Sequence, residues 1–213
     1  ARDLVPVVSV MTSPVLLLAT GATTAQGLPD LLATARARPG AVRWATSGPA
    51  SLGHVMLEQV KQAAKVDITH IPYKGGGQQI NDALSGQFEV LSVNAGPAIS
   101  AHVKAGKLRV LAVGAPARLE AFPSAPTLAE LGFPAANLSS VFGLFAPAGV
   151  PAPILERVNA EVNKALASPE LRSRLVASEN VPTGGSAADF RRLIAQESEN
   201  NARIIQAAGI RAE

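Results

Sequence analysis

Three short segments of the sequence carry residues suited to binding a small anion. They are Ser47–Ser51, Tyr73–Gly77 and Asn94–Pro97, and each combines glycine or proline with small polar residues. Each follows an apolar run and precedes a run with helical character. The unpaired N–H groups at a helix start attract carboxylates and phosphates. The pattern therefore predicts anion binding at three strand-to-helix turns.

The turn at Tyr73–Gly77 is the most informative of the three. The β-branched run Val66–Ile71 ends at Pro72, which cannot donate a hydrogen bond to a sheet. Three consecutive glycines then permit positive φ and close approach of a ligand to the backbone. The helical run Gln78–Leu84 follows. We expect backbone N–H groups here, rather than Lys74, to hold the anion.

The common catalytic and nucleotide-binding patterns are missing. Neither the phosphate-binding loop G-x-x-x-x-G-K-[ST] nor the nucleophile pattern G-x-S-x-G occurs, and no G-x-G-x-x-G follows the first strands. The three histidines lack metal-ligand spacing, and the sequence has no cysteine. His54 can either contact a ligand or stay half-buried near Ser51, while His70 and His102 are interpreted as structural. We predict a binding protein without enzymatic activity, cofactor or metal.

The composition limits the classes of molecule that the protein is expected to bind. The 213 residues are 47% hydrophobic but only 4% aromatic, which indicates a core of small aliphatic side chains. Nineteen basic residues against 16 acidic ones give a net charge of +3. This charge is too diffuse for nucleic acid and slightly favours small anions. No apolar run reaches the roughly 18 residues of a membrane helix. Absence of cysteine fits the cytosol and an oxidising periplasm equally well.

Strands and helices are expected to alternate through the first part of the chain. Strands are predicted at Val5–Val10, Pro14–Ala19, Val42–Thr46, Val66–Ile71, Phe88–Val93, Leu108–Gly114 and Ser140–Ala146. Helices are predicted at Gly27–Ala37, Leu52–Ala64, Gln78–Leu84, Ala98–Lys104, near Leu128–Leu131, and at Ile154–Ala167, Pro169–Ala177 and Ala187–Ala208. This order indicates an α/β domain with a largely parallel sheet, followed by a helical tail. In such a sheet the three turns share one edge, where ligands bind.

Four motifs occur in a fixed order along the chain. They are I-P-Y-K-G at Ile71–Gly75, V-K-A-G-K-L-R-V-L-A-V at Val103–Val113, P-T-L-A-E-L-G at Pro126–Gly132 and F-G-L-F-A-P-A-G at Phe142–Gly149. Together they resemble the solute receptors of tripartite tricarboxylate transporters, the Bug-type periplasmic binding proteins, over essentially all of the chain. The resemblance implies a two-lobed type II periplasmic binding fold. It also implies a periplasmic receptor that captures a small carboxylate for the transporter's membrane permease subunits.

The resemblance also assigns ligand-binding residues by position. They lie in the loops of the second lobe and are Ser47, Gly48, Ser51, His54, Tyr73, Lys74, Gly75 and Asn94. Asn94 stands where many members of the family carry Asp. This difference removes a carboxylate, so the resemblance argues against a ligand that bears an amino group.

The same resemblance divides the chain. Residues 8–139 correspond to the second lobe, and residues 1–7 with 140–213 correspond to part of the first lobe. Members of the family begin with further α/β units, which supply the other wall of the ligand cleft. We therefore expect a truncated receptor that binds weakly or not at all. We also expect an exposed apolar face that favours self-association.

Two other functions remain open from sequence. The effector-binding domain of a transcriptional regulator shares the type II fold and would need a helix-turn-helix ahead of Ala1. An enzyme could use Ser51 and His54 on a small acid, although no acid or base partner is evident.

Overall fold

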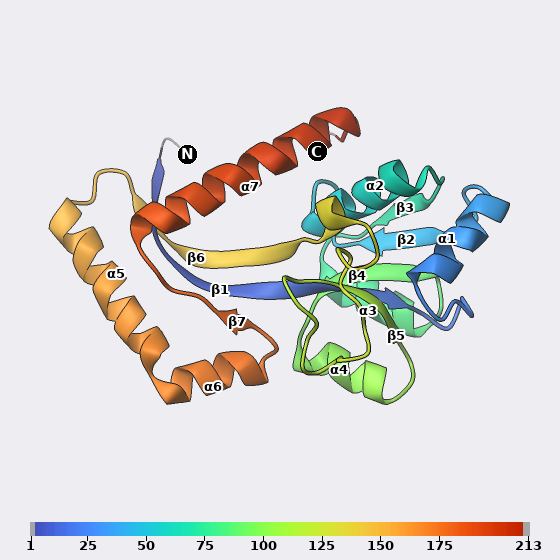
Figure 1. Cartoon of the computed structure of the whole chain (residues 1–213), viewed down its shortest axis with the longest axis horizontal. Coiled ribbons are helices and arrows are strands. Elements are labelled where there is room, and N and C mark those ends of the chain that lie inside the picture. The colour runs from blue at the N-terminus through green and yellow to red at the C-terminus, as the bar shows by residue number, and fades with distance from the viewer. Residues whose placement is uncertain (1–2, 211–213) are drawn as a thin grey trace. The chain divides into compact units, whose positions relative to one another are not determined.

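The computed structural model describes residues 3–210, and these form two compact units (Figure 1). Unit 1 comprises the chain up to Ser13 and Ser140–Arg203, and unit 2 comprises Pro14–Ser139 and the residues from Ile204 onward. Sequence reasoning set the first boundary between residues 7 and 8, whereas the compact units divide after Ser13. Residues 1, 2 and 211–213, at the ends of the predicted segments, lie outside the described residues.

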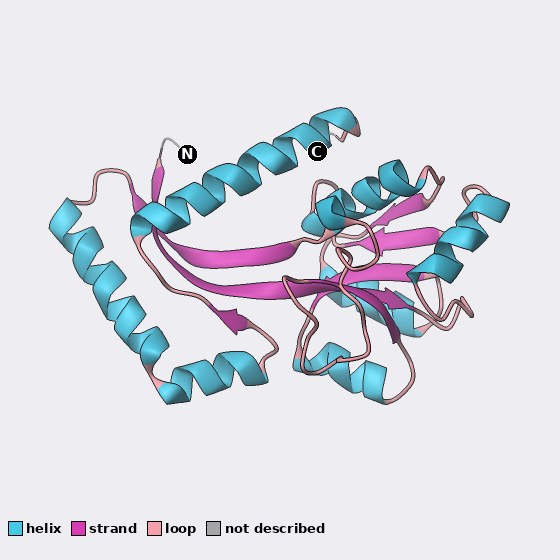
Figure 2. Ribbon diagram, in the orientation of Figure 1, coloured by secondary structure: helices cyan, strands magenta, loops and turns pink. Residues whose placement is uncertain are grey.

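The secondary structure of unit 2 alternates strands with helices (Figure 2). After β1 (Leu4–Ala19), which begins in unit 1, come α1 (Leu28–Ala37), β2 (Arg43–Thr46), α2 (Leu52–Ala64), β3 (Thr69–Pro72), α3 (Gly76–Leu84), β4 (Val90–Asn94), α4 (Pro97–Lys104), β5 (Arg109–Gly114) and the 3-10 turn η1 (Pro134–Ala136). The strand order is β3-β2-β4-β1-β5. β2 runs parallel to β3 and β4, while β1 runs antiparallel to β4 and β5. The predicted α/β class is confirmed, with a mixed sheet around a parallel core.

Unit 1 contains the remaining elements. They are β6 (Ser139–Pro147, whose first residue is assigned to unit 2), α5 (Ala152–Ala167), α6 (Pro169–Ala177), β7 (Val181–Pro182) and α7 (Ala187–Ala207, whose last turn is assigned to unit 2). Both β6 and β7 pair with β1. Within residues 3–210, no helix combines the length and the apolar character that crossing a membrane requires.

The two faces of the unit 2 sheet carry separate apolar clusters. Side chains alternate between the faces along each strand, so Leu17 of β1 joins the cluster with α1 and α2, whereas Leu16 and Leu18 join the cluster with α3 and α4. Trp44 and Ala45 of β2 divide in the same way. The sheet is therefore covered on both sides, which holds the strand ends and the turns after them in fixed positions.

The prediction of two strands before residue 20 was wrong. The structure has one continuous strand, Leu4–Ala19, which passes through Pro14. Pro14 lies where the pairing of β1 changes: Met11 and Thr12 pair with β7, and pairing with β4 and β5 begins at Val15. The carbonyl of Pro14 accepts a hydrogen bond from Ala95 N at 2.8 Å. Because the pairing with β7 ends before this residue and the registered pairing with β4 and β5 begins after it, the missing N–H of proline interrupts none of these three ladders.

Two further predictions need correction. The strand predicted from Val66 begins at Thr69, because Lys65 ends α2 in the left-handed conformation and the chain needs three residues to reach β2. The helix predicted near Leu128–Leu131 is a turn. Thr127 and Glu130 form the reciprocal side-chain-to-backbone bonds of a capping box, but Gly132 at φ 87° stops the chain from continuing as a helix.

Candidate functional site

The carboxyl ends of β2, β3 and β4 lie at one edge of the unit 2 sheet. The register places Ala45 beside both Ile71 and Leu91, so the three parallel strands end side by side. Each strand leads directly into a helix, and α2, α3 and α4 therefore begin at the same edge. This arrangement confirms the placement expected from the sequence. Three helix N-termini give this edge a positive potential that suits an anion.

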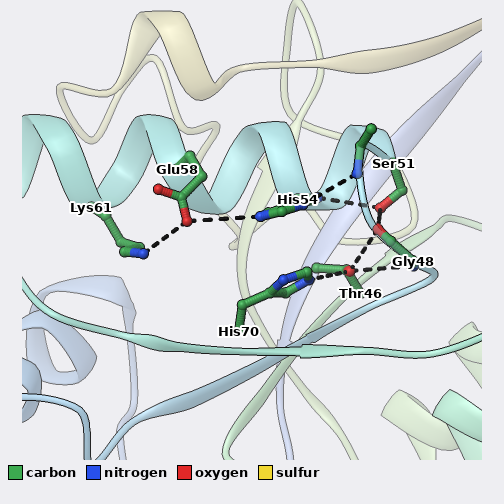
Figure 3. A network of polar contacts seen from close by, with 8 residues as sticks. Thr46, Gly48, Ser51, His54, Glu58, Lys61 and His70 are labelled. Atoms are coloured by element: carbon green, nitrogen blue, oxygen red, sulfur yellow. Dashed lines mark hydrogen bonds and ion pairs between the residues drawn. The ribbon is translucent and has the colours of Figure 1, made fainter. Parts of the chain in front are cut away.

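The loop after β2 is folded around the carbonyl of Gly48 (Figure 3). This oxygen accepts hydrogen bonds from Ser51 Oγ at 2.7 Å and from Thr46 Oγ1 at 3.1 Å. Ser51 is the N-cap of α2, and its Oγ also accepts from His54 N at 3.4 Å. Ala50 lies in the left-handed region at φ 56°, which is unusual for a residue other than glycine. The loop is therefore fixed by its own side chains.

Two histidines pack beneath this loop (Figure 3). The rings of His54 and His70 are stacked, with their centroids 3.8 Å apart and their planes 22° from parallel. Ala50 N donates to His54 Nδ1 at 3.2 Å, and His70 Nε2 lies 2.7 Å from Thr46 Oγ1. Burial lowers the pKa of both side chains, and that of His70 falls to about 4. Both rings are therefore neutral at pH 7.

The turn after β3 is bonded to the loop after β2. Tyr73 N donates to Thr46 O at 2.9 Å, and Gly75 N donates to Ser47 O at 3.2 Å. Gly75 is the N-cap of α3 at φ 104°, a conformation that favours glycine. The helix N–H groups without a partner inside α3 therefore belong to Gly76, Gly77 and Gln78. The bond from Gly75 means that this residue shapes the turn and does not supply a free donor.

The side chain of Tyr73 is hydrogen-bonded to Asp82 of α3 and not to the backbone of the turn. The hydroxyl donates to Asp82 Oδ2 at 2.7 Å, and its ring meets Phe88 edge-on with centroids 5.7 Å apart. Burial is the largest cause that raises the pKa of Tyr73 to about 12, and the hydrogen bond to Asp82 is the second. The phenol is therefore neutral and committed to a neighbouring side chain.

The predicted ligand residues thus differ in how free their polar groups are. Ser51, His54 and Tyr73 use their side-chain groups inside unit 2. Ser47 and Lys74 are exposed, and within residues 3–210 their side chains have no hydrogen-bond or ion-pair partner. Asn94 ends β4, is half-buried and interacts with other groups of the chain. The loops after β2 and β3 are in direct contact, and Asn94 lies on the neighbouring strand.

Sequence reasoning missed Thr46 and Gln79. Gln79 is fully buried in the first turns of α3, and its Nε2 donates to Ala45 O at 2.9 Å and Ser92 O at 3.2 Å. It therefore links β2 to β4 where they end. Its Oε1 has no hydrogen-bond partner within the described residues. A glutamine two residues after three consecutive glycines, at a predicted helix start, was the available signal. Only the fold shows that its amide reaches two strands.

Within residues 3–210, no group of three or more histidine, aspartate or glutamate side chains is arranged to hold a metal ion. The edge of β2, β3 and β4 presents backbone N–H groups, hydroxyls and the exposed Lys74, all of which can donate hydrogen bonds to an anion.

Comparison with known proteins identifies relatives over nearly the whole chain. Residues 1–210 match the model of the family described as tripartite tricarboxylate transporter family receptor. Protein BugT of Bordetella pertussis (strain Tohama I) is 33% identical over 208 residues, which are 98% of this chain and 64% of BugT. The UPF0065 protein in the tcbD-tcbE intergenic region of Pseudomonas sp. (strain P51) is 30% identical, covering 96% of this chain and 61% of its own. The chain thus spans less than two thirds of these relatives.

Solved structures show the same fold. The structure of R. palustris Rpa4515 with adipate gives a TM-score of 0.88 at 32% identity, covering 98% of this chain and 70% of the other. A structure described as a periplasmic transporter also gives 0.88, at 28% identity, with 99% and 70% covered. These similarities confirm the fold class expected from the four sequence motifs.

Proposed function

Because this chain belongs to the tripartite tricarboxylate transporter receptor family, we propose that it is the ligand-capturing part of a periplasmic receptor for a small carboxylate. The family consists of substrate-binding receptors of transporters rather than enzymes. The observation that carries the proposal is the common edge of β2, β3 and β4, where three helices begin. The receptor would deliver its ligand to the membrane permease subunits of a tripartite transporter.

Two features support a carboxylate as the ligand. The N–H groups of Gly76, Gly77 and Gln78 face no partner within α3, and an anion can accept hydrogen bonds from them. The exposed Lys74 adjoins them and adds a positive charge. A neighbour of 32% identity, R. palustris Rpa4515, is known with adipate, a dicarboxylate. The family match favours this function over that of a regulator's effector domain.

Asn94 narrows the proposal to carboxylates without an amino group. At this position the side chain is an uncharged amide, so it cannot neutralise a ligand ammonium group. Leaving an ammonium unpaired at a partly buried site is unfavourable. We therefore expect adipate to bind more tightly than glutamate.

A thermal-shift panel of adipate, glutamate, glucose and AMP at matched ionic strength tests the ligand class. A ligand at 100 times its dissociation constant adds about 2.7 kcal/mol of stability. Adipate should raise the melting temperature, and glucose and AMP should not. Stabilisation by glucose or AMP without a response to any carboxylate would contradict the proposal.

Paired variants at the Tyr73–Gly77 turn test the mode of binding. Gly75→Val should abolish adipate binding, because valine is strained at φ 104° and the turn that presents the α3 N–H groups would move. Lys74→Ala should weaken binding by no more than about threefold, because an exposed, salt-screened charge contributes little. The opposite order would make Lys74 the anchor instead of the backbone.

We further propose that the apolar face of unit 1 is covered in the intact receptor by the part of the first lobe that this chain does not span. Phe142, Leu144 and Phe145 of β6 are each more than 40% exposed. A groove of about 620 Å³ along α5 is lined mostly by apolar residues, among them Ile154 and Val158, together with Arg157 and Glu161. Exposed patches of this kind usually mark an interface.

Sedimentation of the 213-residue chain tests this second proposal. If the face is an uncovered interface, the chain should self-associate, and replacing Phe142 and Phe145 by Ser should make it monomeric. Adipate affinity of the chain should lie in the millimolar range, because the partner region would supply further contacts. A monomer that binds adipate at micromolar strength would contradict both expectations.

A further inference from the structure

The hydrogen bond between Ala50 and His54 fixes the protonation state of one imidazole. Ala50 N donates to His54 Nδ1 at 3.2 Å, so Nδ1 must carry a lone pair and no proton. Ala50 is held in the left-handed region at φ 56°, where only an external constraint keeps a residue with a side chain. Loss of this acceptor would therefore release the loop at Ser47–Ser51 from its observed conformation.

The second imidazole supports the same loop from below. His70 of β3 stacks on His54 at 3.8 Å between ring centroids, and its Nε2 lies 2.7 Å from Thr46 Oγ1. Thr46 in turn donates to Gly48 O and accepts from Gly48 N at 3.3 Å. The two rings thus hold both ends of one loop, through Thr46 at its start and through Ala50 near its end. Figure 3 shows the two histidines beside the loop.

The charged groups around the stack compensate a proton on it only in part: Glu58 raises the pKa of His54, but burial outweighs this effect. Glu58 of α2 faces His54 Nε2 at 3.8 Å, but Lys61 of the same helix binds this carboxylate at 2.8 Å. His70 faces His54, and the charge of Lys61 lowers the pKa of His70. Thr46 of β2, which contacts His70, is uncharged. Burial is the largest cause that lowers the pKa of each histidine, and repulsion from His54 further lowers that of His70. Only one of the stacked rings can readily take up a proton.

We propose that His54 and His70 are positioning residues that hold the Ser47–Ser51 loop in its ligand-binding conformation only while Nδ1 of His54 carries no proton, so that the affinity for a carboxylate falls on acidification. This inference rests on the function proposed above, because it concerns the same loop. It also changes the role expected for His54 from the sequence. The side chain acts through Ala50, and its Nδ1 is not free to contact a ligand.

The direction of the pH effect separates positioning from direct contact. If His54 contacted the ligand, its protonation would place a cation beside a carboxylate and strengthen binding as the pH falls. If His54 positions the loop, protonation turns Nδ1 from an acceptor into a donor that opposes Ala50 N–H, and binding weakens. Both rings have depressed pKa values, so the change falls below pH 6.5, the ordinary value for histidine.

Three variants isolate the effect. His54→Asn places an amide oxygen near the Nδ1 position and cannot take up a proton. His70→Gln likewise keeps a polar group near the Nε2 position without titrating. His102→Gln removes the third histidine, which lies on α4 outside the stack, and serves as the matched control. Protonation of the ligand itself affects all four proteins equally, so ratios between them report the histidines alone.

Adipate affinity is measured by NMR titration at pH 7.5 and pH 5.0 for each protein. Loss of one hydrogen bond in the loop predicts that acidification weakens the wild type and His102→Gln about fivefold more than His54→Asn. His70→Gln should show an intermediate loss. Equal losses in all four proteins, or tighter binding of the wild type at pH 5.0, would overturn the inference.

The ligand-free protein provides an independent readout. The exchange rate and chemical shift of the Ala50 amide are followed from pH 7.5 to pH 4 together with the ring signals of His54. The Ala50 signal should change at the midpoint of His54 and stay constant in His54→Asn. An Ala50 amide that is unaffected while His54 titrates would refute the positioning role. If adipate binds none of the proteins, the ligand proposal fails, and this titration still decides the inference.

Discussion

In unit 2, two apolar clusters fill the space on either side of the sheet, whereas the buried apolar side chains of unit 1 among the described residues are Val7, Val8, Leu166 and Phe190. Within residues 3–210, the large apolar side chains that are exposed all belong to unit 1. Unit 1 also contains hydrogen bonds between segments that are far apart in sequence. Asn163 of α5 donates to Gly185 O at 3.0 Å and accepts from Gly185 N at 2.8 Å. Among the described residues, unit 2 therefore has a well-filled apolar core, whereas unit 1 exposes several large apolar side chains.

This difference bears on where a rigid site can form. The loops after β2 and β3 connect strands and helices with buried side chains on both faces of the sheet, so the ends of both loops are fixed. Preorganised donors lower the entropic cost of binding. Unit 1 offers apolar area but few buried contacts, which suits a surface that becomes ordered by packing against another segment.

The largest difference in stability between the two units should appear when one phenylalanine of each unit is replaced by alanine. Phe88 is 1% exposed in unit 2, and Phe142 is 44% exposed in unit 1. Phe88→Ala should lower the free energy of unfolding by about 3–5 kcal/mol through the cavity it leaves. In the chain diluted until it is monomeric, Phe142→Ala should change the free energy of unfolding by less than about 1 kcal/mol. Urea unfolding measures both, and equal losses would mean that Phe142 is covered in solution.

Removing the Asn163–Gly185 hydrogen bonds should lower the stability less, and only within unit 1. Asn163→Ala breaks the two-way bond with Gly185, and this should cost about 1–2 kcal/mol in local stability of unit 1. Hydrogen exchange should show faster exchange of the Gly185 amide, which donates to Asn163 Oδ1. Amides of β2 and β4 should be unchanged. Faster exchange throughout unit 2 would show that the two units unfold together.

Acidification should destabilise unit 2 through the stacked histidines. The pKa of His70 is about 4 when folded against 6.5 as the ordinary value, so the unfolded chain binds more protons between these limits. Stability is therefore fully present above pH 6.5 and declines as the pH falls toward 4. For a half-buried ring the loss by pH 5 should be about 1 kcal/mol, allowing for solvent screening. His70→Gln should flatten the profile, as urea unfolding at several pH values will show.

Removing one ion pair from each unit should give the smallest difference in lost stability. In unit 2, Glu89 accepts from Arg43 N, Nε and Nη2 at 2.7–3.0 Å, whereas in unit 1 the Arg174–Glu170 pair is exposed. Glu89→Gln should cost about 1 kcal/mol, and Glu170→Gln less than about 0.5 kcal/mol. Thermal unfolding in low and high salt measures both. A larger loss for Glu170→Gln would contradict the contrast between the units.

Local signals in the sequence predicted most elements of the fold. The bounds of α2 and α6 agree with the prediction, because Ser51 and Ser168 are N-caps beside clear helical periodicity. The continuous β1 was not predictable from Pro14, since its tolerance depends on which strands pair on either side. The short β7 has only two residues and depends on pairing with β1.

The candidate site was predictable in position but not in detail. Glycines at Gly48 and Gly75 marked the turns correctly, because positive φ is a property of single residues. Which polar groups remain free is set by tertiary contacts: Ser51 bonds to Gly48 O, and Tyr73 bonds to Asp82. Stacking of His54 on His70 joins residues from α2 and β3 that no spacing rule connects.

NMR mapping of adipate on the 213-residue chain tests whether the edge of β2, β3 and β4 holds the carboxylate. The largest shift changes should occur at the backbone amides of residues 47, 48, 50, 51 and 74–78, with smaller ones at 95, 96 and 98 and none along α5. Gly75→Val should remove these changes while the signals of the unit 2 core persist. Changes confined to α5 and β6, or changes at residues 47–51 and 74–78 that survive Gly75→Val, would contradict a site built from these backbone groups.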